Sequence, residues 1–262
     1  MPQRPSTYDF TSRKGRQTCV QLHVDTAAEA AAAVEAGLTL LGCEADGLEA
    51  MRAAAPTAFL QAGMAHGTVA TPDEAIRAGF ELIARGADTI YCSHSPRFIE
   101  AMAREGIAVT GHVGLVPNLA RFTNFRAIGR SADEAATVVQ RVRDIENAGA
   151  SFLEVEVVPV ELACWITRNT KMITMGMGCG EVCDTQYLFS CDVLGTHAGH
   201  YPRHSKRYAD FVALEAELQA KRVEAFRAFA AEVATKVYPQ ARHEIRMSPE
   251  EHDKFLGRVK AA

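Results

Sequence analysis

One unit recurs along this chain, and it limits the folds that the chain can adopt. Each copy has a Ser/Thr-x-x-Glu box, an apolar-striped segment, a glycine and a short apolar run. In such a box the hydroxyl accepts a backbone N–H at the start of a helix, and the glutamate reaches back. Glycine suits the left-handed turn that ends a helix. The pattern predicts alternating helices and strands, with helices starting after Thr26, Thr71 and Ser131.

Eight apolar runs are long enough to be strands. Strands that alternate with helices form parallel sheets, and eight of them within about 200 residues fit a closed (β/α)₈ TIM barrel. An open doubly wound α/β sheet is the alternative, but no run is followed by the G-x-G-x-x-G of a dinucleotide fold. The predicted strands are 18–25, 39–44, 58–64, 89–94, 108–115, 151–158, 171–178 and 189–194.

The end of the chain has a different pattern. A long, charged helical pattern covers 210–237, and a short helix signal follows at 248–251. We therefore expect a single barrel domain over 1–262 with a helical extension from about residue 205. The extension is either a final barrel helix with a solvated end or a surface for oligomer contacts.

Composition excludes several classes of partner. The net charge of −4 gives no basic field for nucleic acid. No apolar run approaches the roughly 20 residues that span a membrane, and the N-terminus lacks the apolar core of a signal peptide. The seven cysteines form no disulfide-scaffold pattern and suit a reducing compartment. A soluble cytoplasmic protein is expected.

Two acidic residues, Glu154 and Glu156, interrupt the predicted strand 151–158. Residues two apart on a strand point to the same side, so both carboxylates should face one surface. Because burying an unpaired charge is costly, such a pair usually marks a site. In a barrel, reactive groups lie at the carboxyl ends of the strands. The other polar candidates at those ends are His23, Asp25, Cys43, Glu44, Asp46, Gln61, His66, Cys92, Ser93, His94 and His112.

The glycine-rich segment 175–180 follows the seventh predicted strand. It is either a tight turn or a source of exposed backbone N–H groups for a carboxylate or phosphate. Cys179 and Cys183 have poor spacing for zinc, and no second Cys/His pair lies near them in sequence.

Several of these stretches together resemble ketopantoate hydroxymethyltransferases (3-methyl-2-oxobutanoate hydroxymethyltransferases). The likeness runs over about residues 20–239. The more specific blocks are Gly-His-Val-Gly-Leu at 111–115 and Glu-Val-Val-Pro-Val-Glu-Leu-Ala at 156–163. The other matching stretches are 70–75, 129–130, 175–180, 199–202 and 237–239.

The resemblance implies a (β/α)₈ barrel of the phosphoenolpyruvate mutase/isocitrate lyase superfamily. Enzymes of the family bind Mg²⁺, which chelates a 2-oxo acid, and a glutamate assists removal of a proton next to the keto group. The enolate then takes a one-carbon unit from methylenetetrahydrofolate. Glu156 falls on the position of that glutamate, and His112 falls on a substrate-contacting histidine. The family also forms homo-oligomers.

The chain departs from the family where the family holds its metal. The strand-three aspartate becomes Gly63, the strand-four glutamate becomes Ser93, and the lysine just before it becomes Tyr91. At strand two, Glu44 or Asp46 could stand in as ligands for Mg²⁺ or another divalent metal. The segment between strands two and three is also shorter, by on the order of twenty residues, and loops over a barrel mouth often act as lids. We expect the substrate to contact Ser93, Tyr91, Glu154, Gly176 and Gly178.

Glu154 has no expected counterpart in the family. It could be a replacement metal ligand together with Glu44, Asp46 or His66. It could form a dyad with Glu156 that raises one pKa, so that one carboxyl holds a proton. It could also pair with a buried Arg or Lys from a neighbouring strand.

The leading hypothesis is a divergent enzyme of this type. It would act on a small 2-oxo acid or related carboxylic acid by proton abstraction and C–C bond formation or cleavage, with Glu156 and His112 as catalytic residues. A metal-free lyase, hydrolase or isomerase is the second hypothesis. A non-catalytic, ligand-binding homologue is the third.

Overall fold

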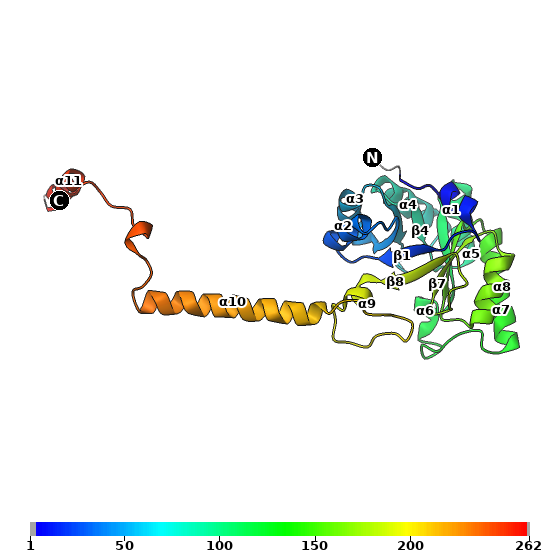
Figure 1. Cartoon of the computed structure of the whole chain (residues 1–262). Helices are drawn as coiled ribbons and strands as arrows, with labels where there is room; N and C mark the ends of the chain where they lie inside the picture. Colours follow the sequence, from blue (N-terminus) through cyan, green and yellow to red (C-terminus); the bar gives the residue numbers. More distant parts are fainter. Residues whose placement is uncertain (1–3, 261–262) are drawn as a thin grey trace. The chain divides into compact units, whose positions relative to one another are not determined.

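The computed structural model describes residues 4–260, and its first part is a closed barrel of eight parallel strands (Figure 1). Each strand pairs with the next, and β8 closes the sheet against β1. The prediction of a (β/α)₈ barrel is therefore confirmed. The strands are β1 (Cys19–His23), β2 (Leu40–Glu44), β3 (Phe59–Gly63), β4 (Thr89–Tyr91), β5 (Val109–Gly114), β6 (Phe152–Glu156), β7 (Ile173–Met177) and β8 (Thr185–Phe189).

Helices surround the strands and begin where the sequence predicts. Thr26, Thr71 and Ser131 each accept the backbone N–H of the glutamate three residues on. The outer helices are α2 (Ala27–Glu35), α3 (Leu48–Ala54), α4 (Pro72–Ala84), α5 (Pro96–Arg104), α7 (Ala132–Asn147) and α8 (Val160–Asn169). Shorter elements are α1 (Thr7–Arg13), η1 (Ala45–Gly47), α6 (Pro117–Ala120) and α9 (Ser190–Leu194).

An aromatic cluster fills the interior of the barrel near the start of its strands. Phe10 of α1 packs edge-on against Phe59 of β3 and Phe152 of β6, with ring centroids 5.0 and 5.9 Å away. All three are buried, together with Leu40 and Met175. Because this packing closes one end of the barrel, polar side chains can gather at the other end, where the strands finish.

The eighth strand is not where the sequence predicts it. Residues 185–189 form β8, whereas most of the predicted strand 189–194 is the short helix α9. The strand is fixed by its register against β1, in which Cys19 pairs with Thr185 and His23 with Phe189. Gly195, with φ of 67°, ends α9 in a left-handed turn that favours glycine. The prediction overlooked this glycine as a helix-ending signal.

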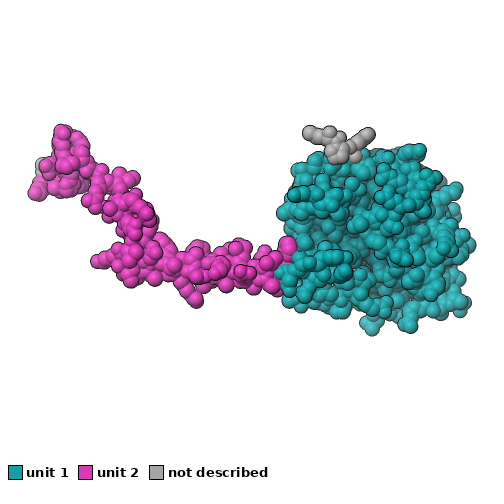
Figure 2. All heavy atoms as spheres, viewed as in Figure 1, with its two compact units in different colours: residues 1–210 teal, residues 211–262 magenta. Residues whose placement is uncertain are grey.

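The chain divides after Asp210 into two compact units (Figure 2). The second unit contains α10 (Phe211–Ala234), η2 (Ala241–His243) and α11 (Pro249–Lys260). The extension expected from about residue 205 thus begins as a helix at Phe211. No residue of α10 is buried, and Phe226 and Phe229 are 71% and 56% exposed. Within residues 4–260 no helix is both long and apolar enough to cross a membrane.

Candidate active site

A small cavity of about 130 Å³ lies at the carboxyl ends of the strands. It collects side chains from all eight strands, which a closed barrel brings together from distant parts of the sequence. The polar residues that line it are His23, Glu44, Gln61, Tyr91, His112, Glu154, Glu156 and Tyr187.

His112 stands between the two glutamates of β6. In the parallel pairing of β5 with β6, His112 lies beside Glu154, and Gly114 lies beside Glu156. The His112 Nε2 atom is 3.2 Å from Glu156 Oε2, and its Nδ1 atom is 3.5 Å from Glu154 Oε2. Both glutamates line the cavity, so the prediction that they face the same side is confirmed.

Tyr91 determines which nitrogen of His112 carries the proton. The Tyr91 hydroxyl lies 2.8 Å from His112 Nδ1. Burial raises the pKa of Tyr91, so the phenol stays protonated and donates this hydrogen bond. Nδ1 is then the acceptor, and a neutral imidazole carries its hydrogen on Nε2. Nε2 lies close to Glu156 Oε2, although the two groups are not aligned for a hydrogen bond.

Glu154 is buried, with 4% of its surface exposed, and its close partners are neutral or weakly basic groups. Gln61 Nε2 donates to Glu154 Oε1 at 2.6 Å. Burial raises the pKa of Glu154 to about 7, against the opposing effects of His112 and the Gln61 hydrogen bond. No Arg or Lys of the described chain forms an ion pair with Glu154, so the explanation by a buried cation is wrong.

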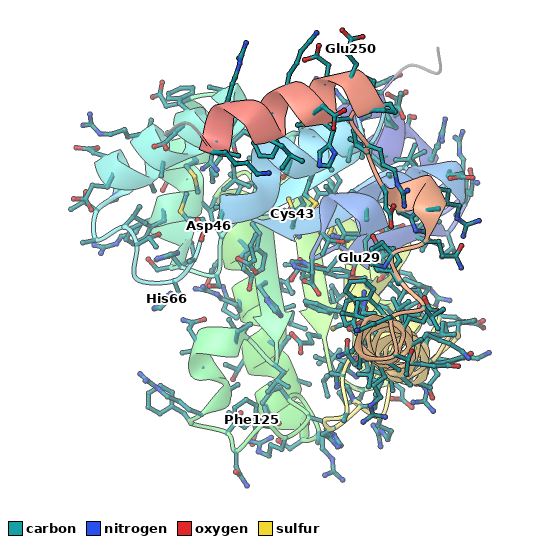
Figure 3. All side chains as sticks on the ribbon, turned by 90° about the vertical axis from the view of Figure 1, so that its left-hand side faces the viewer. Glu29, Cys43, Asp46, His66, Phe125 and Glu250 are labelled. Atoms are coloured by element: carbon teal, nitrogen blue, oxygen red, sulfur yellow. The ribbon has the colours of Figure 1, made fainter. Side chains whose placement is uncertain are left out.

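Glu44 takes the space beside Gly63 on the next strand. The two residues are paired in the β2–β3 register. A Cβ atom built on Gly63 would lie 3.1 Å from Glu44 Oε2. The carboxylate of Glu44 therefore lies where a side chain at position 63 would extend. Asp46, labelled in Figure 3, is exposed in η1 and is not among the residues that line the cavity.

Tyr187 and His23 form a further polar pair in the cavity. The Tyr187 hydroxyl lies 3.3 Å from His23 Nδ1, and the His23 ring stacks on Phe189. Burial raises the pKa of Tyr187 and lowers the pKa of His23, which favours the uncharged form of both. The sequence identified His23 as a polar candidate at the carboxyl end of the first strand. It missed Tyr187 because the eighth strand was predicted four residues too late.

Three predicted substrate contacts lie away from this cavity. Ser93 lines a different cavity. Gly176 faces two buried thiols and not the cavity. A Cβ atom built on it would contact Cys179 and Cys183, whose sulfur atoms are 3.6 Å apart. Gly178 has φ of 67°, and a Cβ there would meet the ring of His204. Met177, between the two glycines, is the residue of this segment that lines the active-site cavity.

One group of three potential metal ligands occurs among the residues that the structure describes, and it lies outside the cavity. Cys191, Asp192 and His197 bring ligand atoms within 4.8 Å of one another. The backbone N–H of Gly199 donates to His197 Nδ1, so the neutral ring carries its proton on Nε2. That N–H lies 3.3 Å from Asp192 Oδ1 and is engaged there, so its nitrogen has no free lone pair for a metal.

The charge of the active-site cavity suits a cation. Three carboxylates line it, those of Glu44, Glu154 and Glu156, whereas none of its described lining residues is Lys or Arg. Mg²⁺ prefers oxygen ligands and is often held by one or two carboxylates together with water and substrate. Glu44, at the exposed rim, fits the role of such a ligand.

Comparison with known proteins identifies the family. The family model described as ketopantoate hydroxymethyltransferase matches residues 14–241, most of the chain. The chain belongs to this family. It is 33% identical over 194 residues to a 3-methyl-2-oxobutanoate hydroxymethyltransferase of Chloroflexus aurantiacus, covering 72% of this chain and 66% of that protein. It is 34% identical over 189 residues to that of Shewanella loihica, covering 71% and 69%.

Solved structures support the fold alone. The chain is similar to 2,3-dimethylmalate lyase, a member of the PEP mutase/isocitrate lyase superfamily, with a TM-score of 0.52 and 12% identity over 98% of this chain and 99% of that one. It is also similar to the carboxyl transferase domain of Rhizobium etli pyruvate carboxylase, with a TM-score of 0.53 and 13% identity over 71% of this chain and 42% of that one. At this identity the likeness carries no information on substrate.

Proposed function

We propose that this chain is a divergent ketopantoate hydroxymethyltransferase-like enzyme. It acts on a small 2-oxo acid or related carboxylic acid, by proton abstraction and C–C bond formation or cleavage. The observation that carries the proposal is the contact of Glu156 with His112, 3.2 Å apart in a cavity at the end of a barrel. The cavity, at about 130 Å³, suits a small acid, because sites for larger organic ligands occupy about 300–1,000 Å³.

Glu156 is the proposed general base. Tyr91 holds one ring nitrogen of His112, and the other ring nitrogen lies 3.2 Å from Glu156 Oε2, so this series of contacts positions the carboxylate at the cavity. The base takes a proton from the carbon next to the keto group, and the C–H electron pair moves into the enolate. Water releases the one-carbon unit from its donor as formaldehyde, the enolate carbon adds to the C=O carbon, and the resulting alkoxide takes the proton held by Glu156. That donor is methylenetetrahydrofolate if the family activity is retained.

Neutral donors around the cavity can hold the enolate oxygen. Tyr187 and Gln61 line it, and Glu154, with its pKa raised to about 7, is partly protonated at neutral pH. A phenol and a neutral carboxylic acid in a dry site are effective hydrogen-bond donors to such an oxyanion. This assigns Glu154 a role that does not require it to be charged.

A divalent cation would be held at Glu44. Bound there, Mg²⁺ would supply Lewis-acid polarisation of the keto group and offset the charge of the substrate carboxylate. Asp46, the second predicted ligand, would have to move to reach the cavity. Substrate contact by Ser93, Gly176 and Gly178 would likewise require rearrangement of the segments that carry them.

The Glu156→Gln variant tests this function. Exchange of the α-protons of 2-oxo acids in deuterated water is followed by NMR for the wild type and the variant. We expect exchange by the wild type and its loss in the variant, with an unchanged circular dichroism spectrum. Full exchange by Glu156→Gln would overturn the assignment of the base. No exchange of any 2-oxo acid by the wild type would favour a different reaction or a binding role.

The setting that we propose is a homo-oligomer in the cytoplasm, without nucleic-acid or membrane partners. The exposed apolar side chains of α10, including Leu214, Phe226 and Phe229, support contacts with further copies. The seven cysteines are free thiols, as a reducing compartment keeps them. Sedimentation of the full chain, compared with a Phe226→Ser variant, tests the oligomer.

A further inference from the structure

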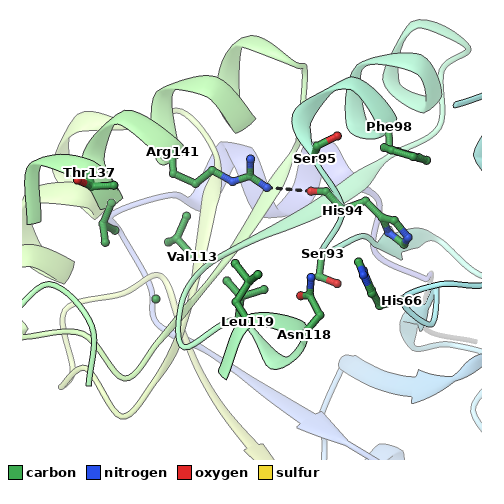
Figure 4. A pocket seen from close by; sticks show the side chains of 13 residues that line it. His66, Ser93, His94, Ser95, Phe98, Val113, Asn118, Leu119, Thr137 and Arg141 are labelled. Carbon is green, nitrogen blue, oxygen red and sulfur yellow. Dashed lines mark hydrogen bonds between the residues drawn. The ribbon is translucent and has the colours of Figure 1, made fainter. Parts of the chain in front are cut away.

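A second cavity, of about 510 Å³ (Figure 4), shares no lining residue with the active-site cavity. Along β5, His112 lines the active-site cavity and Val113 lines the second one, because neighbouring side chains of a strand point to opposite faces. The second cavity therefore lies between the barrel wall and the helices α5 and α7, which contribute Phe98 and Arg141.

Arg141 brings a positive charge into this cavity. Its Nη2 atom donates to the backbone carbonyl of His94 at 2.9 Å, across the cavity (Figure 4). No carboxylate of the described chain forms an ion pair with Arg141, and no Asp or Glu is among the lining residues. A guanidinium has five N–H groups in a fork that matches a carboxylate. Asp144, one turn further along α7, acts on Arg141 only through its longer-range field, so no carboxylate of the described chain occupies the N–H groups that face the cavity.

Further polar atoms of the cavity also lack partners. His94 Nε2 and Asn118 Oδ1 are buried and form no hydrogen bond. The His94 side chain is fixed between the rings of His66 and Phe98, with centroids 4.6 and 5.0 Å away. Burial and the nearby His66 lower the pKa of His94, so its ring is neutral at pH 7. Buried polar atoms without a protein partner are uncommon, and these two are free to form a hydrogen bond with a bound molecule or water.

The walls of the cavity are mainly apolar. Val113, Leu119 and Val138 form one part, and the ring of Phe98 forms another. The volume lies in the range of sites for small organic molecules, which is about 300–1,000 Å³. The single guanidinium of Arg141 balances one negative charge, whereas a phosphate would need more.

We propose that this cavity binds an organic carboxylate with a planar apolar body. The carboxylate pairs with the free N–H groups of Arg141, and the planar body lies against Phe98 and the aliphatic wall. Polar atoms at the edge of that body form hydrogen bonds with His94 Nε2 and Asn118 Oδ1. The site is independent of the proposed reaction, since none of its residues belongs to the active-site cavity.

Calorimetric titration of the full chain with naphthoate and with its neutral analogue naphthamide tests the site. Wild type should bind naphthoate, and Arg141→Gln should weaken that binding by roughly tenfold or more, the usual effect of losing a charge-assisted hydrogen bond. Binding of naphthamide should be weaker in the wild type and unaffected by Arg141→Gln. Because glutamine is too short to reach the His94 carbonyl, unchanged naphthamide binding by Arg141→Gln also serves to show that the cavity keeps its shape.

Two further variants keep the test decisive. Arg143→Gln removes the same charge from α7 but contacts Trp165 outside the cavity, so it should bind naphthoate like the wild type. Leu119→Trp fills the cavity from a half-exposed position and should block both probes. The proposal is overturned if wild type binds neither probe at millimolar concentration. It is also overturned if Arg141→Gln and Arg143→Gln bind naphthoate equally, or if inorganic phosphate binds more tightly than naphthoate.

Discussion

Replacing Glu154 with glutamine should make the protein more stable at alkaline pH. Burial raises the pKa of Glu154 from 4.5 to about 7. A carboxyl group with a higher pKa in the folded state takes up a proton on folding between these two values. Stability therefore falls as the pH rises from about 4.5 to about 7, where the unfolded chain ionises first. Glutamine has the same shape and stays neutral, so it avoids this loss.

The size of the effect follows from the shift. One pKa unit corresponds to 1.36 kcal/mol, so about 2.5 units correspond to about 3 kcal/mol above pH 8. For a chain of this size, each kcal/mol moves the melting temperature by roughly 2–4 °C. The Glu154→Gln variant should therefore melt on the order of 10 °C higher than the wild type at pH 8.5, and at the same temperature at pH 4.5. The amide oxygen of the new glutamine can still accept the hydrogen bond from Gln61 Nε2.

Thermal and urea unfolding at several pH values provide the assay. Glu81→Gln, an exposed position on α4, serves as the control that removes the same charge and should show no such dependence on pH. Equal stability of wild type and Glu154→Gln across pH 4.5–8.5 would refute the reasoning. It would mean that His112 or a bound cation keeps Glu154 ionised in the folded protein.

Two further substitutions test the residues that hold Glu156 in position. Gly114→Ala should lower the free energy of unfolding in denaturant by about 2–5 kcal/mol, because residue 114 has φ of 92° and its Cβ would lie 2.0 Å from the Glu156 carbonyl oxygen. Gly106→Ala is the control, since residue 106 has φ of 81° but open space around its Cβ, and it should cost clearly less. Equal costs for the two variants would contradict the clash. Tyr91→Phe removes the donor to His112 Nδ1 and should slow α-proton exchange roughly 10–100-fold, with a changed imidazole tautomer by nitrogen NMR. An unchanged rate would separate Tyr91 from the chemistry.

The barrel could be predicted because its signals are local. A capping hydroxyl and the glutamate three residues later lie on one helix turn, and the predicted starts after Thr26, Thr71 and Ser131 agree with the structure. The predicted position of the eighth strand was wrong because both the length and the register of that strand depend on its pairing with β1. The segment 189–194 is apolar enough for a strand, and Gly195 was the local signal against it.

The active site was predictable only in part, for a similar reason. The spacing of Glu154 and Glu156 indicated that both face the same side, and the structure agrees. The partner of Glu154 could not be predicted, because Gln61 is 93 residues away and is brought near only by closure of the barrel. The second cavity left no sequence signal, since Arg141 looks like an ordinary charged residue of an outer helix.

The pairing of Glu44 with Gly63 suggests that one carboxylate has moved between neighbouring strands. The family resemblance implies an aspartate on strand three, and Gly63 occupies that position. Glu44 Oε2 lies 3.1 Å from the place of the missing Cβ, so the longer side chain reaches the same space from β2. A carboxylate restored at position 63 should therefore replace the one at position 44.

The variants Glu44→Ala and Glu44→Ala/Gly63→Asp test this exchange. The single variant should bind Mn²⁺ or Mg²⁺ at least roughly tenfold more weakly than the wild type, because it loses a ligand. The double variant should recover most of that affinity, since removal of Glu44 frees the space that an aspartate needs. Asp46→Asn is the control, because it removes one exposed charge near the cavity and should leave binding unchanged. If the double variant binds no better than the single one, then Glu44 is a rim charge and not the relocated ligand.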